Sequence, residues 1–230
     1  MRVIRRILSL LVALPLAAVT SYLGFCFMLI AFYAIVPPPT TGVHIQRRIE
    51  ALASGSEYTK RYDPVSRSKI SGHLAHALVA AEDGRFYQHG GIDWDAVKKA
   101  LEDNKRRGRA WRGGSGITQQ LVKNLFQTTH SSGWQRYARK AFEVPLVYAA
   151  EWTLSKERIL TLYLNVIEWG PGVYGAQAAA QHHYNIDAAN LSRRQSASLA
   201  AIVPAPRSRT PGRMGRYTGI IETRMRQMGW

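Results

Sequence analysis

Two groups of carboxylates lie where they could take part in proton transfer or charge stabilisation. Glu82 and Asp83 end an apolar segment and are followed by a turn that contains glycine. A carboxylate with an apolar flank has its ionised form disfavoured, which raises its pKa toward values useful for a general base. Glu143 follows Arg139 and Lys140 by four and three residues, so these side chains share one helix face. The alternatives are an acidic pair that solvates a helix end, and a weak surface ion pair.

A segment rich in glycine and hydroxyl side chains, residues 113–124, lies between the two groups. Such a segment leading into a helix presents backbone N–H groups that can hold an anion. Lys123 adds a positive charge inside that helix, where it would suit a phosphate. A nucleotide-binding P-loop is excluded, because that motif requires lysine where Gly114 stands.

The elements that must position these residues are mostly helices. Apolar residues recur at helical spacing in several segments, and no convincing alternating strand pattern is present. Asp93 and Ser155 are expected N-caps, and Ser192 with Gln195 forms a capping box. The sequence therefore predicts a mainly α domain, with apolar helix faces at 74–81, 94–101, 117–125, 159–166, 199–203 and 217–228.

The first 36 residues differ from the rest of the chain. Residues 7–36 contain no charged side chain and follow three arginines. At 1.5 Å per residue this run could cross a ~30 Å hydrocarbon core, and the arginines favour a cytoplasmic N-terminus. A cleaved signal peptide would have an apolar core of about 7–15 residues. We expect a cytoplasmic tail (1–6), a retained transmembrane helix (7–36), a linker and jaw entry (37–64) and an external domain (65–230) that needs nothing from the helix to fold.

The chain of 230 residues carries 31 Lys and Arg against 15 Asp and Glu, a net charge of +16 with neutral His. Subtracting the three N-terminal arginines from +16 leaves +13 on the external part. At a membrane surface this charge favours anionic headgroups or a phosphate-bearing lipid substrate over nucleic acid, although it could be merely solubilising. The length excludes a multi-span transporter, and the single cysteine, Cys26, excludes a disulfide scaffold.

Together these residues resemble the peptidoglycan glycosyltransferases, glycosyltransferase family fifty-one. The four signatures occur in order, and the resemblance covers about residues 65–206. Because the chain stops where the two-domain penicillin-binding proteins continue, it resembles the monofunctional members. The matching segments are Glu82–Gly91, Gly113–Asn124, Arg139–Glu143 and Ile159–Asn165, with further agreement at Gly170–Gly175 and Gln195–Pro206.

The resemblance implies a lysozyme-like α-helical fold with an apolar jaw in the membrane, and polymerisation of lipid II. In that reaction the 4-hydroxyl of one N-acetylglucosamine attacks C1 of the growing chain's N-acetylmuramic acid, with inversion and loss of undecaprenyl diphosphate. It also implies a divalent cation, Mg²⁺ or Mn²⁺, and no organic cofactor. The implied location is the inner (cytoplasmic) membrane, and the implied partners are lipid II, the lipid-linked glycan, membrane lipids and other cell-wall or division proteins.

The resemblance also implies roles for individual residues. Glu82 would be the general base. Glu143 would orient basic residues or a metal near the diphosphate, and the ligands of that metal stay unassigned. Lys123 and Arg139 would contact phosphate. The full set of expected substrate-binding residues is Asp83, Phe86, Ser115, Thr118, Gln119, Gln120, Lys123, Asn124, Arg136, Arg139, Lys140, Tyr163 and Asn165.

Three positions depart from the family pattern. Gly116 stands where many members have threonine, Gln135 where members have arginine, and Pro145 is expected to kink the helix of Glu143. Two other functions stay open. A lysozyme-like hydrolase would cleave glycan with water and without lipid II, and a non-enzymatic scaffold would retain its function after Glu82→Gln.

Overall fold

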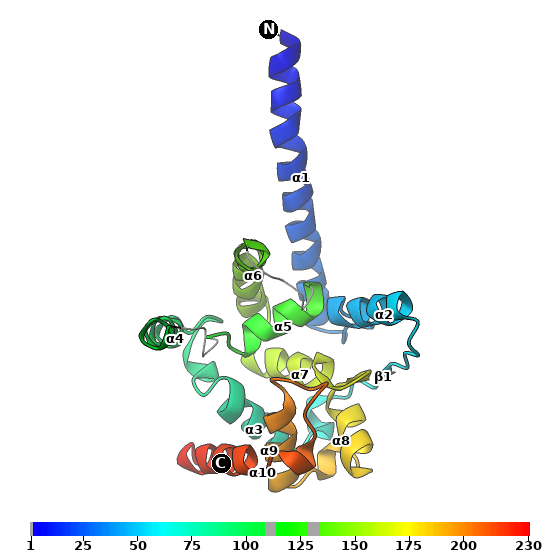
Figure 1. Ribbon diagram of the computed structural model, residues 1–230, viewed down its shortest axis with the longest axis vertical. Coiled ribbons are helices and arrows are strands. Elements are labelled where there is room, and N and C mark those ends of the chain that lie inside the picture. Colours follow the sequence, from blue (N-terminus) through cyan, green and yellow to red (C-terminus); the bar gives the residue numbers. More distant parts are fainter. Residues whose placement is uncertain (1, 109–113, 128–133) are drawn as a thin grey trace.

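The computed structural model describes residues 2–108, 114–127 and 134–230, and of residues 2–5, 7–9 and 134–138 only the backbone. Most of its secondary-structure elements are helices, and Figure 1 shows how they are arranged. The α-helices are α1 (Arg2–Tyr33), α2 (Gly42–Ser54), α3 (Gly72–Glu82), α4 (Trp94–Arg107), α5 (Ile117–Phe126), α6 (Trp134–Thr153), α7 (Lys156–Val166), α8 (Ala176–Tyr184), α9 (Arg193–Ile202) and α10 (Gly215–Gln227). The expectation of a mainly α fold is confirmed.

Local capping chemistry fixes several of the helix ends as expected. The Asp93 side chain accepts the Ala96 N–H at 2.9 Å at the start of α4, and Ser155 accepts the Arg158 N–H at 3.1 Å at the start of α7. A capping box opens α9, as predicted. Because each signal satisfies backbone donors that the first helical turn leaves free, it acts independently of the rest of the fold.

Two parts of the fold differ from the expectation. The segment predicted as a linker, residues 37–64, contains helix α2, whose start is capped by Thr41. A small sheet also forms from β1 (Arg61–Tyr62), β2 (Glu168–Gly170) and β3 (Val173–Tyr174), in the order β1-β3-β2. β1 pairs parallel with β3, and β2 pairs antiparallel with it. Strands of two or three residues are too short to show an alternating pattern.

Helix α1 extends well beyond the rest of the protein, with the N-terminus at its free end (Figure 1). Its segment Leu10–Tyr33 is long and apolar enough to cross a membrane. Large apolar side chains along this segment, such as those of Leu11 and Leu14, are exposed. An exposed apolar helix of this length is consistent with a membrane anchor.

The last turns of α1 nevertheless belong to the folded domain. Cys26 and Ile30 are each 1% exposed and lie within the main apolar core. The side chain of Arg158 on α7 donates to the carbonyl of Tyr33 at 2.7 Å, and α1 packs along α6. The end of α1 thus contributes to the core, and folding of the domain without residues 1–36 stays a prediction.

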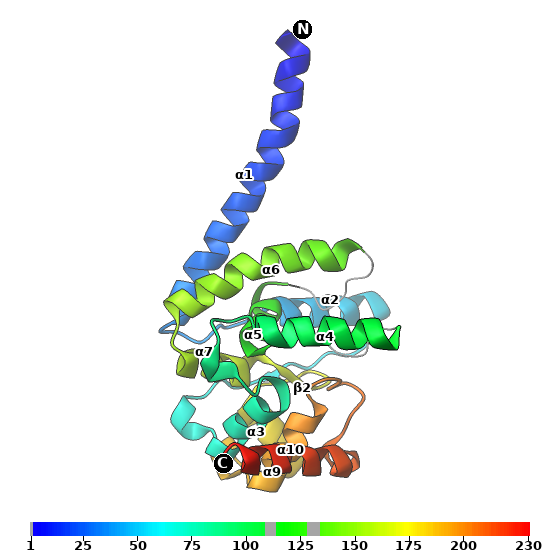
Figure 2. The ribbon, with the colours of Figure 1, turned by 90° about the vertical axis from the view of Figure 1, so that its left-hand side faces the viewer.

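The helices around the core form two groups along the long axis of the protein. Figure 2 shows α6 beside the lower part of α1, whereas α9 and α10 lie at the end farthest from the N-terminus. Helix α3 packs on α9 and α10, and α5 packs on α6 and α7. The C-terminal end of α3 and the N-terminal half of α5 thereby meet in the middle of the domain, where the predicted site residues lie.

Candidate active site

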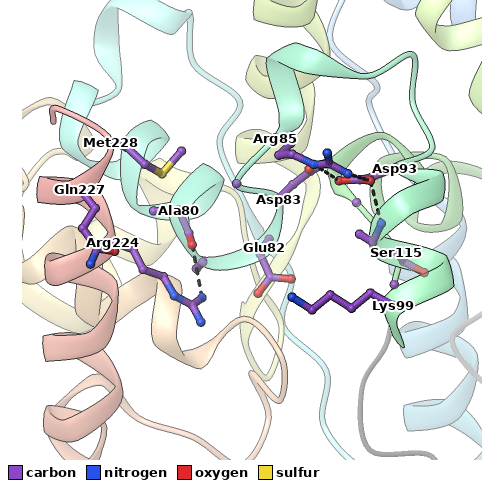
Figure 3. Close-up of a pocket in the computed structure, with 15 residues that line it drawn as sticks. Ala80, Glu82, Asp83, Arg85, Asp93, Lys99, Ser115, Arg224, Gln227 and Met228 are labelled. Carbon is purple, nitrogen blue, oxygen red and sulfur yellow. Dashed lines mark hydrogen bonds and ion pairs between the residues drawn. The ribbon is translucent and has the colours of Figure 1, made fainter. Parts of the chain in front are cut away.

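The last residue of α3, Glu82, faces a pocket of about 520 Å³. The pocket is bordered by the residues that follow α3, by the start of α5, and by side chains of α4 and α10. Figure 3 shows the Glu82 carboxylate pointing into the space between Lys99 and Arg224. A carboxylate in this position can reach a ligand that enters the pocket.

The neighbouring carboxylate, Asp83, is used to join α3 to α5. It is buried, and its Oδ2 accepts the backbone N–H of Ile117 at 2.9 Å while its Oδ1 lies 2.9 Å from Nε2 of His89. A Cβ on Gly116 would lie 2.3 Å from Asp83 Oδ2. Glycine at position 116 therefore lets the carboxylate approach the start of α5, which gives this departure from the family pattern a physical reason.

A chain of hydrogen bonds orients Glu82. The Tyr163 hydroxyl of α7 donates to Gln120 Oε1 at 2.7 Å, and Gln120 Nε2 donates to Glu82 Oε2 at 2.7 Å. Because burial disfavours its ionised form, the pKa of Glu82 is raised, although the Gln120 bond and the charge of Lys123 oppose that shift. Burial also raises the pKa of Tyr163 well above its ordinary value, so its hydroxyl stays a donor. Glu82 is thus held in place and has a raised affinity for a proton.

Replacing the first donor in this chain should change the pH dependence of activity. In Tyr163→Phe, Gln120 is no longer held in one orientation and donates less well to Glu82, so the Glu82 pKa should rise further. We expect the acid limb of the kcat–pH profile to move up by about one pH unit, with up to a tenfold loss of kcat below it. Tyr174→Phe is the matched control, because Tyr174 is an equally buried tyrosine whose hydroxyl bonds to Tyr58 and not to Gln120. Identical profiles for the two variants would contradict this role of Tyr163.

A cationic group lies next to Glu82, on α5 and α6. Lys140 Nζ donates to Ser115 Oγ at 3.0 Å and to Glu143 Oε1 at 2.6 Å, and Glu143 is 1% exposed. The pKa of Lys123 is lowered by burial and by the charges of Arg139 and Lys140, while Glu143 and Glu82 oppose the shift. The structure therefore brings together both predicted carboxylates and the three cations, and the cations are in excess.

This cationic group is suited to a polyanion. Burial and like charge disfavour the protonated form of Lys123, so a bound anion would relieve a repulsion that is present without it. Arg139 Nε is buried with no hydrogen-bond partner within the described part of the chain. A buried charged donor without an acceptor is costly, and a diphosphate oxygen would supply one.

The described residues do not form a resident metal site. No three His, Cys, Asp or Glu side chains converge within residues 2–108, 114–127 and 134–230. Glu143 has one buried oxygen, Oε2, without a partner among these residues, but its other oxygen is bound by Lys140. A single carboxylate neutralised by an ammonium is a poor donor set for Mg²⁺ or Mn²⁺. The expected cation requirement stays a prediction, and no step below depends on it.

Several residues predicted to contact substrate bind other parts of the protein, and their contact with substrate stays a prediction. Phe86 is fully buried, with Lys156 Nζ 4.5 Å from its ring centroid. The side-chain amide of Asn165 bonds to backbone groups. Its oxygen accepts the N–H of Val65, and its nitrogen donates to the carbonyls of Val65 and Thr161. Each side chain holds two distant segments together.

Several polar side chains of α5 also form hydrogen bonds within the protein. Thr118 is fully buried and donates to Glu151 Oε1 at 2.5 Å, and Gln119 accepts the N–H of Gly116 at 3.2 Å. Asn124 donates to the Gln120 carbonyl at 2.7 Å. Ser115, just before α5, lines the pocket beside Glu82, whereas the Gln120 amide holds Glu82.

The sequence analysis missed the interactions that hold the loop after Glu82. Lys156, at the start of α7, donates to the carbonyl of His89 at 2.7 Å and to Glu151 of α6 at 2.9 Å, and Glu151 in turn accepts from Thr118 of α5. Gly91 adopts φ +93° there, where a Cβ would meet Val147 at 2.6 Å. The spacing of Glu151 and Lys156 resembles an ordinary surface pair, so no local signal distinguishes them.

Two predictions from the sequence concern α6, one at Arg136 and one at Pro145. The side chains of Arg136 and Gln135 lie outside the described residues, so the predicted phosphate contact of Arg136 stays a prediction. Pro145 lies within α6, which continues to Thr153. The helix thus runs through the proline and places Glu143 against the cationic group.

These features together define a class of enzyme. An oriented carboxylate with a raised pKa faces a pocket, and an excess of cations lies beside it. This arrangement can take a proton from a hydroxyl nucleophile while a negatively charged group leaves. Helix α1 is consistent with a membrane anchor for such an enzyme.

Comparison with known proteins identifies the family. A family model described as "Transglycosylase" matches residues 48–228. A biosynthetic peptidoglycan transglycosylase of Herminiimonas arsenicoxydans is 41% identical over 229 residues, covering 98% of this chain and 97% of the relative. A protein of the same description from Bordetella pertussis is 42% identical, covering 97% and 94%, and one from Dechloromonas aromatica is 48% identical over 70% of each chain. The chain belongs to the transglycosylase family.

Proposed function

We propose that this protein is a peptidoglycan glycosyltransferase that polymerises lipid II into β-1,4 glycan strands for cell-wall synthesis. One observation carries the proposal: Glu82, with its raised pKa, lies between a pocket and a cluster of cations that includes Lys123. Family membership and the names of the relatives support the same reaction.

In the proposed reaction Glu82 accepts the proton of the acceptor's 4-hydroxyl as that oxygen bonds to C1 of the donor. The bond between C1 and the diphosphate oxygen breaks, and the diphosphate leaves with the electron pair. Lys123 and Arg139 offset the charge that develops on the leaving oxygen. Glu143 holds Lys140 beside Ser115, and Gln120 holds Glu82, so these residues position the charged groups.

The cation cluster favours transfer over hydrolysis. A lysozyme-like hydrolase needs a carboxylic acid to protonate an alcohol leaving group. A diphosphate is already a good leaving group that needs charge compensation, which the cations beside Glu82 supply. Mg²⁺ or Mn²⁺, if it takes part, would arrive with the diphosphate oxygens, and loss of activity on chelation would reveal it.

Incubation of the full-length protein with labelled lipid II in detergent tests the proposal. Glycan strands should appear on a gel while undecaprenyl diphosphate is released in equal amount. Release of sugars from preformed glycan without use of lipid II would instead indicate a hydrolase. Activity in neither assay would leave the scaffold function and would refute the proposed one.

We propose that α1 spans the inner membrane with its N-terminus in the cytoplasm and the catalytic domain outside. The arginines that precede the apolar run support this orientation. The exposed apolar side chain of Trp152 on α6 supports further contact of the domain with lipid. A reporter enzyme fused after Trp230 should be active only outside the cytoplasm. A reporter that is active in the cytoplasm would contradict this topology and access to external lipid II.

A further inference from the structure

Two cations that no predicted motif contains face the same pocket as Glu82. Lys99 comes from α4 and Arg224 from α10, and both line the pocket of about 520 Å³. Figure 3 shows their side chains extending from opposite walls, with the Glu82 carboxylate between their charged ends. Neither belongs to α5 or α6, the helices that carry the Lys123 group.

The other charges around this pocket are already paired. Asp83 is bound by His89 and the Ile117 N–H, and Arg85 forms an ion pair with Asp93. Lys99, by contrast, makes no hydrogen bond or ion pair within the part of the chain that the structure describes; its nearby acidic neighbour, Asp103, is bound by Arg106.

Arg224 is held in place but keeps donors for a ligand. One of its N–H groups donates to the carbonyl of Ala80 at 3.4 Å, two residues before Glu82. Arginine has five N–H donors, so the guanidinium can bind a carboxylate while this bond is kept. With Lys99 opposite, the pocket offers two available cations and one carboxylate, Glu82.

The position of the pocket indicates which anion it receives. Helices α5 and α6, which carry the Lys123 group, lie closer to α1, whereas α10 lies at the opposite end of the protein (Figures 1 and 2). A lipid-linked substrate keeps its diphosphate close to the membrane and extends its sugars and peptide away from it. The wall of the pocket that carries Arg224 therefore faces the part of the substrate that is farthest from the lipid.

We propose that Lys99 and Arg224 bind the peptide carboxylates of the acceptor lipid II and so determine acceptor affinity. The proposal rests on the proposed function and adds two specificity residues to it. The diphosphate of the acceptor is the other anion with suitable chemistry, and the test below separates the two sources.

The test uses the full-length protein and a labelled donor whose 4-hydroxyl is methylated, so that the label can serve as donor and not as acceptor, and the initial rate of its first transfer is measured. Acceptor lipid II is varied in concentration, with its peptide carboxylates either free or amidated. The variants are Lys99→Met, Arg224→Met and Arg224→Lys. Lys98→Met and Arg226→Met are matched controls, because each lies on the same helix and does not line the pocket. Thermal unfolding of every variant checks that the fold is retained.

We expect each methionine variant to raise the apparent KM for the free-carboxylate acceptor about tenfold, with kcat and the donor KM within twofold of the parent. Arg224→Lys should recover part of this loss, because the charge is kept. Amidation of the acceptor removes the partner of both cations, so it should raise the KM of the parent protein by at least the factor seen for either variant and should raise the KM of each variant by less than that of the parent.

Three results would overturn the inference. Variants that behave like Lys98→Met and Arg226→Met, in a parent protein that transfers glycan, would show that these cations are only solvated, while the proposed function stands. An equal rise of KM for free and amidated acceptors would assign the cations to the diphosphate. A parent protein that transfers nothing to either acceptor would refute the proposed function and this inference together.

Discussion

Glu82→Gln should give a folded protein with a transfer rate about 10²–10⁴-fold below the parent, because an amide cannot accept the proton of the attacking hydroxyl. Glutamine fills nearly the same space, and its side-chain oxygen can still accept from Gln120 Nε2, which lies 2.7 Å from the carboxylate in the parent. The loss should therefore come from the missing base. Lipid II consumption under single-turnover conditions measures it.

The same substitution should not destabilise the protein at neutral pH. Burial raises the folded-state pKa of Glu82 above its unfolded value, so the ionised group opposes folding. This penalty is absent below the unfolded pKa, grows as the pH rises toward the folded pKa, and is complete above it. Removing the charge should leave the Tm of Glu82→Gln at pH 7 equal to or above that of the parent.

Glu102→Gln, on the exposed side of α4, is the control for Glu82→Gln and should change neither rate nor Tm. In the parent protein the rate should fall as the pH drops through the raised pKa of Glu82, because the base becomes protonated. Activity of Glu82→Gln within threefold of the parent would remove Glu82 from the base role.

The sequence predicts those parts of the fold that depend on local chemistry. Asp93 and Ser155 cap helices at the expected residues, because an N-cap bonds only to the turn that follows it. The small sheet could not be predicted in this way. Arg61 pairs with Val173 across more than 100 residues, and a strand of two residues leaves no periodic signal.

The candidate site was also only partly predictable from the sequence. Motif spacing correctly indicated that Lys123 and Glu143 lie near Glu82, since all three are coupled electrostatically. It did not distinguish residues that face the pocket from residues that hold the backbone. Asn165 is a polar residue of a signature, yet its amide is used to fix the segment at Val65. Only the tertiary structure shows where such a side chain points.

Lys123→Ala should lower the rate of transfer about 10²-fold or more, because a charge that compensates the leaving diphosphate is lost. Lys123→Arg should keep a measurable part of the activity, since the charge persists while its geometry changes. Lys69→Ala, an exposed lysine on the 3-10 helix Arg67–Lys69, is the control and should match the parent. Single-turnover rates with lipid II at saturating concentration provide the comparison.

The pH dependence of the transfer rate tests whether the positive charge of Lys123 is needed. Burial and the neighbouring cations lower the pKa of Lys123, and transfer needs the protonated form, so the parent rate should fall as the pH rises through this lowered value. Arginine stays protonated throughout the accessible range, so the alkaline limb of Lys123→Arg should move to higher pH. An unmoved limb would assign that titration to another group. Alanine and arginine variants that are equally active would make Lys123 an ordinary helix residue with no part in diphosphate departure.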